Sequence, residues 1–143
     1  QEWHRDGYTI STDPARLDLD GMQKFLERSY WADGIPRDLL ERAVANSMPF
    51  GMYDANGQVG FARVISDHAT FGYLADVLVL EAHRGKGLSK WLMECVLAHP
   101  ELQGFRRWVL LTRDAHGLYR QFGFHELEQP ERWMELRPRP GYR

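Results

Sequence analysis

The chain has 143 residues, and its 18 Lys and Arg nearly balance its 20 Asp and Glu, which leaves a formal net charge of −2. A length of roughly 100–200 residues is typical of one domain, so residues 1–143 are expected to form a single domain with one core. The weak negative charge argues against a dedicated nucleic-acid-binding protein, which would be strongly basic. The single cysteine, Cys95, excludes a disulfide framework and a zinc site built from cysteines.

The chain contains no apolar run of the roughly 18 residues that cross a bilayer, and its first residues do not resemble a signal peptide. It also contains no repeat, low-complexity tract or linker. We therefore expect a cytoplasmic protein without a membrane partner.

The first predicted element is a short strand at residues 7–11, where apolar and polar residues alternate. A helix follows, and either Asp18 or Asp20 is expected to cap it. A second helix is predicted over residues 36–46, because Pro36 suits a first helical position and apolar residues recur after it at helical spacing.

The middle of the chain changes to a strand pattern. Asn56-Gly57 stands between alternating apolar residues, which is a strong signal for a β-hairpin. A further strand is predicted over residues 70–80, and its apolar end, residues 77–80, is typical of a central strand covered on both faces. A helix over residues 87–98 comes next.

Residues 107–112 predict a strand, and residues 114–121 predict a short helix that ends before Gly123. Two further strands are predicted at residues 124–127 and 133–136. Hairpins followed by a βαβ unit indicate an α/β (α+β) fold with a mixed sheet and helices on both faces.

The Gly85-Lys86-Gly87 turn joins the apolar strand directly to the following helix. Glycines allow backbone N–H groups to approach a ligand closely, and a helix N-terminus adds unpaired donors, which together favour phosphate binding. The turn matches neither a Walker A loop nor the dinucleotide fingerprint, which would require a third glycine at position 90. Read by itself, the turn could also be a purely structural connection with solvated basic side chains.

Two motifs in this region resemble those of the GNAT superfamily of N-acetyltransferases. The segment Ala82-His83-Arg84-Gly85-Lys86-Gly87-Leu88-Ser89 is similar to its pyrophosphate loop, and Ala115-x-x-Leu118-Tyr119-x-x-Phe122-Gly123-Phe124 is similar to its later motif. The resemblance covers residues 50–124 well and the first 45 residues by element order. Ala82, Ser89 and Thr112 depart from the usual family residues, but none of them removes a main-chain donor.

The resemblance implies a GNAT-like acyl-CoA N-acyltransferase fold with a mostly antiparallel sheet of about six or seven strands. It also implies acetyl-CoA as cosubstrate and no metal. The residues expected to bind acetyl-CoA are Val77, Leu78 and Val79 on a bulged strand, and Arg84, Gly85, Lys86, Gly87, Leu88 and Ser89 in the loop.

The resemblance implies that Tyr119 is a general acid, since a phenol is protonated at neutral pH and can donate to a departing thiolate. Asp76 is the candidate general base, because a carboxylate among apolar strand residues needs a partner or a task. The alternative for Tyr119 is simple packing, and for Asp76 a structural hydrogen bond. His68 and His116 are weaker candidates, acting through water.

The amine acceptor is expected to meet the connection between the first two helices. Tyr30, Trp31 and Tyr73 are candidate walls of its pocket, although aromatic residues before a helix often only fix its entry angle. Asp33 and the acidic balance of the chain would suit a cationic amine. We expect a small-molecule or peptide acceptor and no nucleic acid. The resemblance allows a homodimer, since relatives often dimerise, but the sequence leaves the oligomeric state open.

Cys95 is placed on the inner face of a helix, so a buried and inert thiol is expected. The acetyl group would then pass directly from acetyl-CoA to a primary amine in a ternary complex. The alternative function is a non-catalytic acyl-CoA-binding or sensing module of the same fold.

Overall fold

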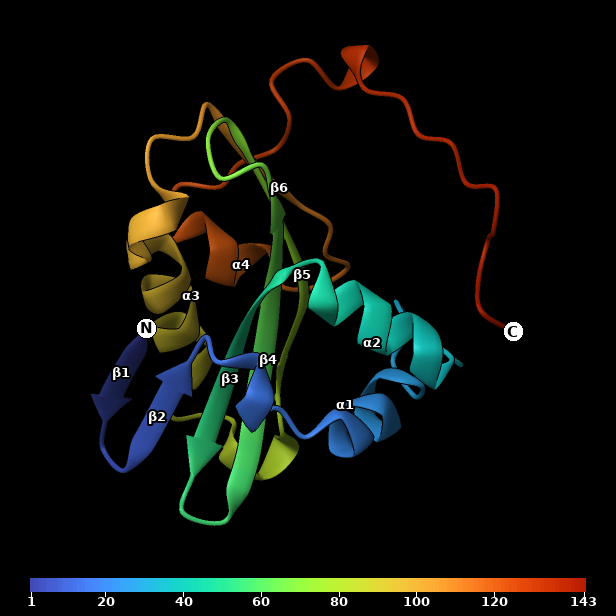
Figure 1. The fold of residues 1–143 in the computed structure, drawn as a ribbon. Helices are drawn as coiled ribbons and strands as arrows, with labels where there is room; N and C mark the ends of the chain where they lie inside the picture. Colours follow the sequence, from blue (N-terminus) through green and yellow to red (C-terminus); the bar gives the residue numbers. More distant parts are fainter.

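A mixed sheet of six strands runs through the molecule, and the strands lie side by side in their order along the chain (Figure 1). The computed structural model describes residues 1–143. The strands are β1 (Glu2–Arg5), β2 (Tyr8–Ser11), β3 (Met48–Asp54), β4 (Gly57–Ser66), β5 (Phe71–Val79) and β6 (Arg107–Leu110). All neighbours pair antiparallel except β5 and β6, which are parallel.

Helices cover both faces of this sheet. They are α1 (Leu19–Leu26), α2 (Arg37–Ala45), α3 (Leu88–Ala98) and α4 (His116–Arg120). Buried residues of α1 and α2 form one apolar cluster with Phe61 and Leu78, whereas those of α3 and α4 form a larger cluster with Phe50 and Val79. The predicted class, a mixed α/β sheet with helices on both faces, is confirmed.

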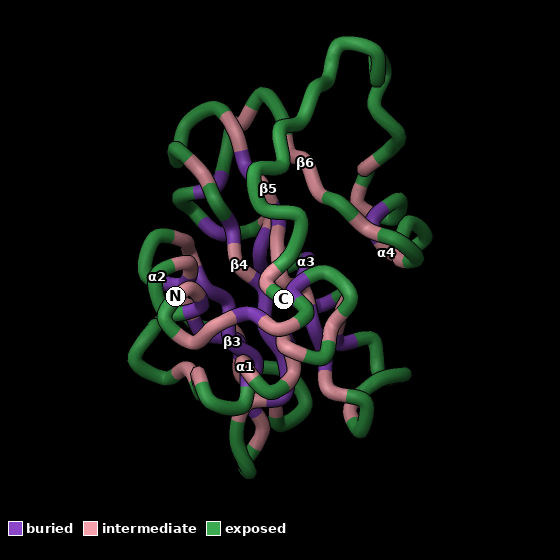
Figure 2. Tube along the Cα trace, turned by 90° about the vertical axis from the view of Figure 1, so that its right-hand side faces the viewer, coloured by how far each residue is buried: buried purple, intermediate pink, exposed green.

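The buried residues concentrate where these helices meet the central strands (Figure 2). Leu78 and Val79 are neighbours on β5, yet they belong to different clusters because successive strand residues face opposite sides of the sheet. The apolar run at the end of β5 therefore packs on both faces, as its composition predicts. No helix of the structure combines the length and apolarity that crossing a membrane requires.

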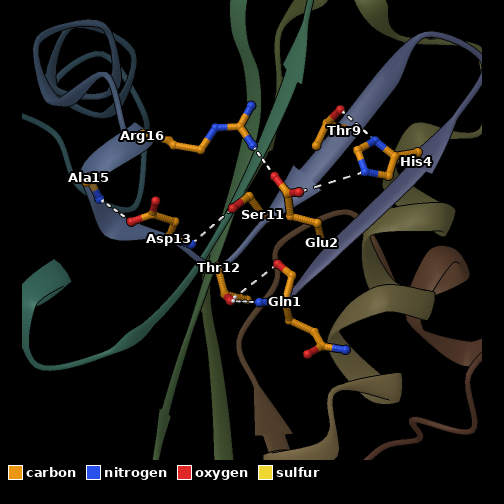
Figure 3. Close-up of polar contacts among 9 residues, drawn as sticks. All are labelled: Gln1, Glu2, His4, Thr9, Ser11, Thr12, Asp13, Ala15 and Arg16. Atoms are coloured by element: carbon orange, nitrogen blue, oxygen red, sulfur yellow. Dashed lines mark hydrogen bonds and ion pairs between the residues drawn. The ribbon is translucent and has the colours of Figure 1, made fainter.

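The N-terminal hairpin contains a strand, β1, that the sequence analysis did not anticipate. Asp6 and Gly7 both have positive φ, as a two-residue type I′ turn requires, and Arg5 pairs with Tyr8 across that turn. Asp-Gly is a hairpin signal of the same kind as Asn-Gly. Polar contacts then tie this hairpin to the following 3-10 turn, including Arg16 Nη1 donating to Glu2 (Figure 3).

Local capping sets the start of the helices on the α1–α2 face. Asp18 caps α1 by accepting a hydrogen bond from the Gly21 N–H at 3.1 Å, which selects Asp18 over Asp20. Pro36 is the N-cap of α2, so the helix begins at Arg37, one residue later than predicted.

The two strands predicted near the C-terminus, 124–127 and 133–136, are wrong. After α4 the chain is irregular apart from a 3-10 turn at Pro130–Arg132, and it arches away from the sheet (Figure 1). Met134 is 97% exposed, so its alternation with neighbouring polar residues does not reflect a buried face. Alternation shows that a segment could pair, but a strand also needs a neighbour within reach, and β6 keeps its outer edge free.

Candidate functional site

The two parallel strands β5 and β6 separate part-way along their length. They pair only from Phe71–Leu74 to Arg107–Leu110, whereas β5 continues to Val79 with no neighbour on that side. Leu80 donates its N–H to Val59 of β4 at 2.8 Å. Because successive strand residues turn their amides to opposite edges, Val77 and Val79 present theirs to the open edge.

A bulge lies in the part of β5 that extends beyond its pairing with β6. Arg63 pairs with Ala75, but Phe61 pairs with Leu78, so β5 has one residue more than β4 over this interval. Asp76 has a φ of +53°, an uncommon conformation for a residue with a side chain. A bulge releases backbone groups from the ladder and re-aims side chains, which is why bulges occur beside binding sites.

The glycine-containing loop lies directly after the open end of β5. Gly85 has a φ of +80°, and Gly87 has a φ of +74° as the N-cap of α3. No side chain caps this helix, and its first internal hydrogen bond is Trp91 N–H to Gly87 O. The N–H groups of the first turn, residues 88–90, therefore have no helical acceptor, and the positive end of the helix dipole adds to their attraction for an anion.

Side-chain contacts tie this loop to β2, β3 and the end of β5. His83 Nδ1 lies 2.9 Å from the Tyr8 hydroxyl, and His83 Nε2 lies 3.6 Å from an Asp54 carboxylate oxygen. Arg84 Nε donates to the Val79 carbonyl at 3.0 Å, so this arginine joins the loop back to the open edge of β5. Lys86 Nζ reaches the Tyr8 hydroxyl at 3.4 Å.

Tyr119 lies on α4, within the cluster on the α3 side of the sheet, and is 7% exposed. Burial, with a smaller contribution from the nearby Tyr30, raises the pKa of its phenol to about 12. Its hydroxyl has either solvent contact or a hydrogen-bond partner. Tyr119 is therefore a protonated donor whose ring is fixed by packing.

Asp76 has protein partners for both carboxylate oxygens. Arg63 Nε donates to Oδ2 at 2.5 Å, and the Trp31 indole N–H donates to Oδ1 at 2.9 Å. Arg63 also reaches the Ser47 hydroxyl at 3.0 Å. The carboxylate thus joins the bulge of β5 to the connection between α1 and α2.

Tyr30 and Trp31 lie together on that connection, in edge-to-face contact at 5.1 Å between ring centroids. They line a pocket of about 600 Å³ that also includes Leu80, the residue after β5, and Arg113, which follows β6. The pocket therefore lies at the carboxyl ends of the two separated parallel strands, a common place for ligands in open α/β sheets.

Tyr73 and Asp33 were both expected to lie near the acceptor, and the structure places them in different surroundings. Tyr73 is half-buried on β5, where burial raises the pKa of its phenol while Arg63 lowers it. Asp33 lies outside the pocket lining, and its carboxylate accepts a hydrogen bond from Arg143 Nε at 2.9 Å. Asp33 therefore already has a cationic partner from the end of the chain.

Cys95 is buried on α3 among the core residues, and burial raises the pKa of its thiol to about 12. His68 lies in the exposed turn between β4 and β5, and His116 is exposed at the start of α4. No three side chains of His, Cys, Asp or Glu come together as a set that could hold a metal ion.

The family model of the acetyltransferase (GNAT) domain matches residues 45–126, more than half of the chain. The chain belongs to the GNAT acetyltransferase family. A protein of Gibberella zeae, named only as a candidate acetyltransferase, is 37% identical to it, and the match covers 83% of this chain and 79% of the relative.

Solved structures share the GNAT fold. A candidate acetyltransferase of the GNAT family from Xanthomonas campestris pv. campestris has a TM-score of 0.90 and 48% identity, and the match covers 93% of this chain and 94% of that one. A candidate acetyltransferase from Clostridium acetobutylicum, solved with acetyl-CoA, has a TM-score of 0.65 and 17% identity over 90% of this chain and 94% of that one. The second likeness concerns the fold alone.

Thr112, one of the departures from the usual GNAT motifs, makes a local hydrogen bond. Thr112 stands where an Asn is frequent, and its hydroxyl accepts the N–H of Ala115, the N-cap residue of α4, at 3.0 Å. Sequence reasoning missed Arg63 and Arg113 as members of this GNAT site. A single arginine among the mostly apolar residues of β4 was a usable signal for Arg63, whereas nothing local singles out Arg113.

Proposed function

We propose that this GNAT domain transfers an acetyl group from acetyl-CoA directly to a primary amine in a ternary complex. The observation that carries the proposal is the unpaired edge of β5 at Val77–Val79, directly before the glycine-containing loop. A pantetheine arm has amides that can pair with a free strand edge, and a pyrophosphate suits the first turn of a helix. The two features adjoin, so one extended cofactor can use both.

In this proposal the diphosphate of acetyl-CoA lies on the backbone of residues 84–89, and the thioester lies near the bulge at Asp76. The separation of β5 and β6 connects the two faces of the sheet. Tyr119 then approaches the sulfur from the α3 side, while the amine arrives from the pocket beside Tyr30 and Trp31.

The reaction forms one C–N bond and breaks one C–S bond. The amine nitrogen attacks the thioester carbonyl, the thiolate of CoA departs, and the proton that the nitrogen loses balances the proton that the thiol finally gains. The Val77 N–H is suited to stabilise the carbonyl oxygen as it gains charge, because it faces the open edge beside the bulge.

Tyr119 acts in this scheme as a hydrogen-bond donor to the leaving sulfur. A thiol has a pKa of about 8.5, whereas burial raises the pKa of Tyr119 to about 12. Full proton transfer from the phenol to the thiolate would therefore be uphill. A donated hydrogen bond still lowers the energy of the anion as it forms, and the charge-assisted bond is strongest when the thiolate has developed.

Asp76 has a positioning role in this proposal. Both of its oxygens already accept hydrogen bonds from Arg63 and Trp31, so a proton from the amine would have to compete with a guanidinium. The amine is expected to lose its proton to water. The base role that the sequence suggested for Asp76 stays a prediction, and its contacts favour the alternative.

Two measurements test the function. Isothermal titration with acetyl-CoA and with free CoA should show binding, and release of CoA thiol should rise above the hydrolysis background when a panel of amines is added. Binding without any amine-dependent release would support the non-catalytic module instead. Absence of acetyl-CoA binding would refute the proposal altogether.

A further inference from the structure

The pocket beside Tyr30 is basic, although the chain as a whole carries a net charge of −2. Lys24, Arg28 and Arg113 line it, and no Asp or Glu belongs to its lining. We call these residues and the space between them the basic pocket. Local and overall charge have opposite signs here, so the composition of the chain does not predict what this pocket attracts.

The cations of the basic pocket form few ion pairs with carboxylates of the protein. The ion pairs of the structure do not include Lys24 or Arg28. The ion pair of Arg113 is with its neighbour Asp114, at 3.8 Å between nitrogen and oxygen. Both side chains are mostly exposed, and such a pair contributes little to stability. Like charges around one space repel, and an anion bound between them would remove that repulsion.

Helix electrostatics explains only part of this arrangement. Lys24 is in the last turn of α1 and Arg28 follows it by four residues, where the negative end of a helix dipole favours cations. The dipole offers no reason for Arg113, which comes from the segment after β6 and completes the set.

Arg113 is held at the pocket by specific contacts. Its guanidinium carbon lies 3.9 Å from the centre of the Tyr30 ring, and its backbone N–H donates to the Tyr30 hydroxyl at 3.1 Å. Trp31 in turn contacts Tyr30 and donates to Asp76 at the bulge. The basic pocket is therefore tied to the place where the proposed function puts the thioester.

We propose that the acceptor of this enzyme is an amine that also carries a carboxylate or phosphate group, and that the basic pocket binds this anionic group. The inference rests on the proposed function, which places the acceptor on this face of the sheet. It reverses the expectation of a cationic acceptor, because Asp33 is already paired with Arg143 and lies outside the pocket. The anion would fix one end of the acceptor and leave its amine free to reach the bulge.

The phosphates of CoA are the other anions that could meet these cations. The two sources predict different losses when the cations are removed. If the pocket serves the acceptor, discrimination between acceptors falls and affinity for CoA stays. If it serves CoA, affinity for CoA falls and discrimination between acceptors stays.

The test compares amines that differ by the anionic group alone. Phosphoethanolamine is paired with ethanolamine, and L-phenylalanine with its amide, and kcat/KM is measured by thiol release at saturating acetyl-CoA. The wild-type protein is expected to favour the anionic member of at least one pair tenfold or more. The double variant Lys24→Gln, Arg28→Gln is expected to bring that ratio to within about twofold of unity, with the Kd of CoA unchanged. The control variant is Arg42→Gln, which removes an exposed cation of α2 outside the pocket.

A wild-type preference for the anionic amine below tenfold in both pairs overturns the inference, as does a double variant that weakens CoA binding and keeps the acceptor ratio. If no amine is acetylated, the proposed function fails, and the inference is then judged by equilibrium binding to the CoA-loaded protein. The anionic member of at least one pair must bind at least fivefold more tightly than its neutral partner, and the double variant must abolish that difference. Equal affinities within both pairs, or no binding of any of the four amines, overturn it.

Discussion

The substitution Gly85→Ala tests whether the glycine loop binds CoA in the conformation that the structure shows. Gly85 has a φ of +80°, and no atom lies within 4 Å of the position that a Cβ would occupy. An alanine therefore meets no clash, and the whole effect is conformational. A non-glycine residue in the left-handed region costs roughly 1–2 kcal/mol.

This cost is expected to appear in the affinity for CoA. Gly85 is exposed, so without ligand the loop can relax to a conformation that alanine tolerates. Binding has to restore the original one. Because 1.4 kcal/mol corresponds to a factor of ten, the Kd of CoA should rise about 5- to 30-fold. Isothermal titration with free CoA measures this directly and does not depend on the identity of the acceptor.

Gly104→Ala is the matched control. Gly104 has a φ of +76° and also has no atom within 4 Å of its Cβ position, but it lies in the loop before β6. Gly104 is exposed like Gly85 but lies away from the proposed CoA site, so Gly104→Ala should leave the Kd of CoA within twofold. The reasoning is refuted if Gly85→Ala binds CoA as tightly as the wild type, or if both variants weaken binding equally.

The other predictions concern the reacting groups. Tyr119→Phe should lower kcat by about 10²–10³, the usual effect of removing one donor to a developing anion, with the Kd of acetyl-CoA within twofold; an unchanged kcat would remove Tyr119 from the mechanism. Because burial raises the pKa of Tyr119 to about 12, its phenol stays protonated below that pH, so the pH–rate profile of the wild type should rise towards the pKa of the amine and show no fall up to pH of about 10. Cys95→Ala should keep wild-type turnover while its small cavity costs about 1 kcal/mol in urea denaturation, and a folded but inactive variant would favour an acetyl-cysteine intermediate. Asp76→Asn should lower the melting temperature, because it leaves Arg63 without its anion, and should raise the KM of the acceptor without changing the shape of the pH–rate profile; loss of the rising limb would instead identify Asp76 as the base.

In the proposed mechanism, the separated strands let one small domain bring three groups to a single thioester. The α3 side supplies Tyr119, the α1–α2 side supplies the acceptor pocket, and the open edge of β5 lies between them. A fully paired sheet would keep these faces apart, since backbone hydrogen bonds would occupy the edge that a cofactor needs.

Elements with local signals could be predicted from the sequence. Asp18 caps α1, and the apolar end of β5 packs on both faces. The strands predicted at 124–127 and 133–136 failed because alternation alone cannot supply a pairing neighbour. The hairpin at Asp6-Gly7 carried a usable signal that short flanking strands obscured.

The sequence by itself determined the fold class, the glycine loop and the tyrosine motif, because each depends on residues within about ten positions of one another. Only the tertiary structure decided which residues lie together around the proposed site. Trp31 meets Asp76 across 45 positions, and Arg113 meets Tyr30 across 83. Such contacts form when the sheet and helices close on each other, and no local periodicity encodes them. The positive charge of the basic pocket is likewise a property of the folded surface, and its sign is opposite to that of the net charge of the chain.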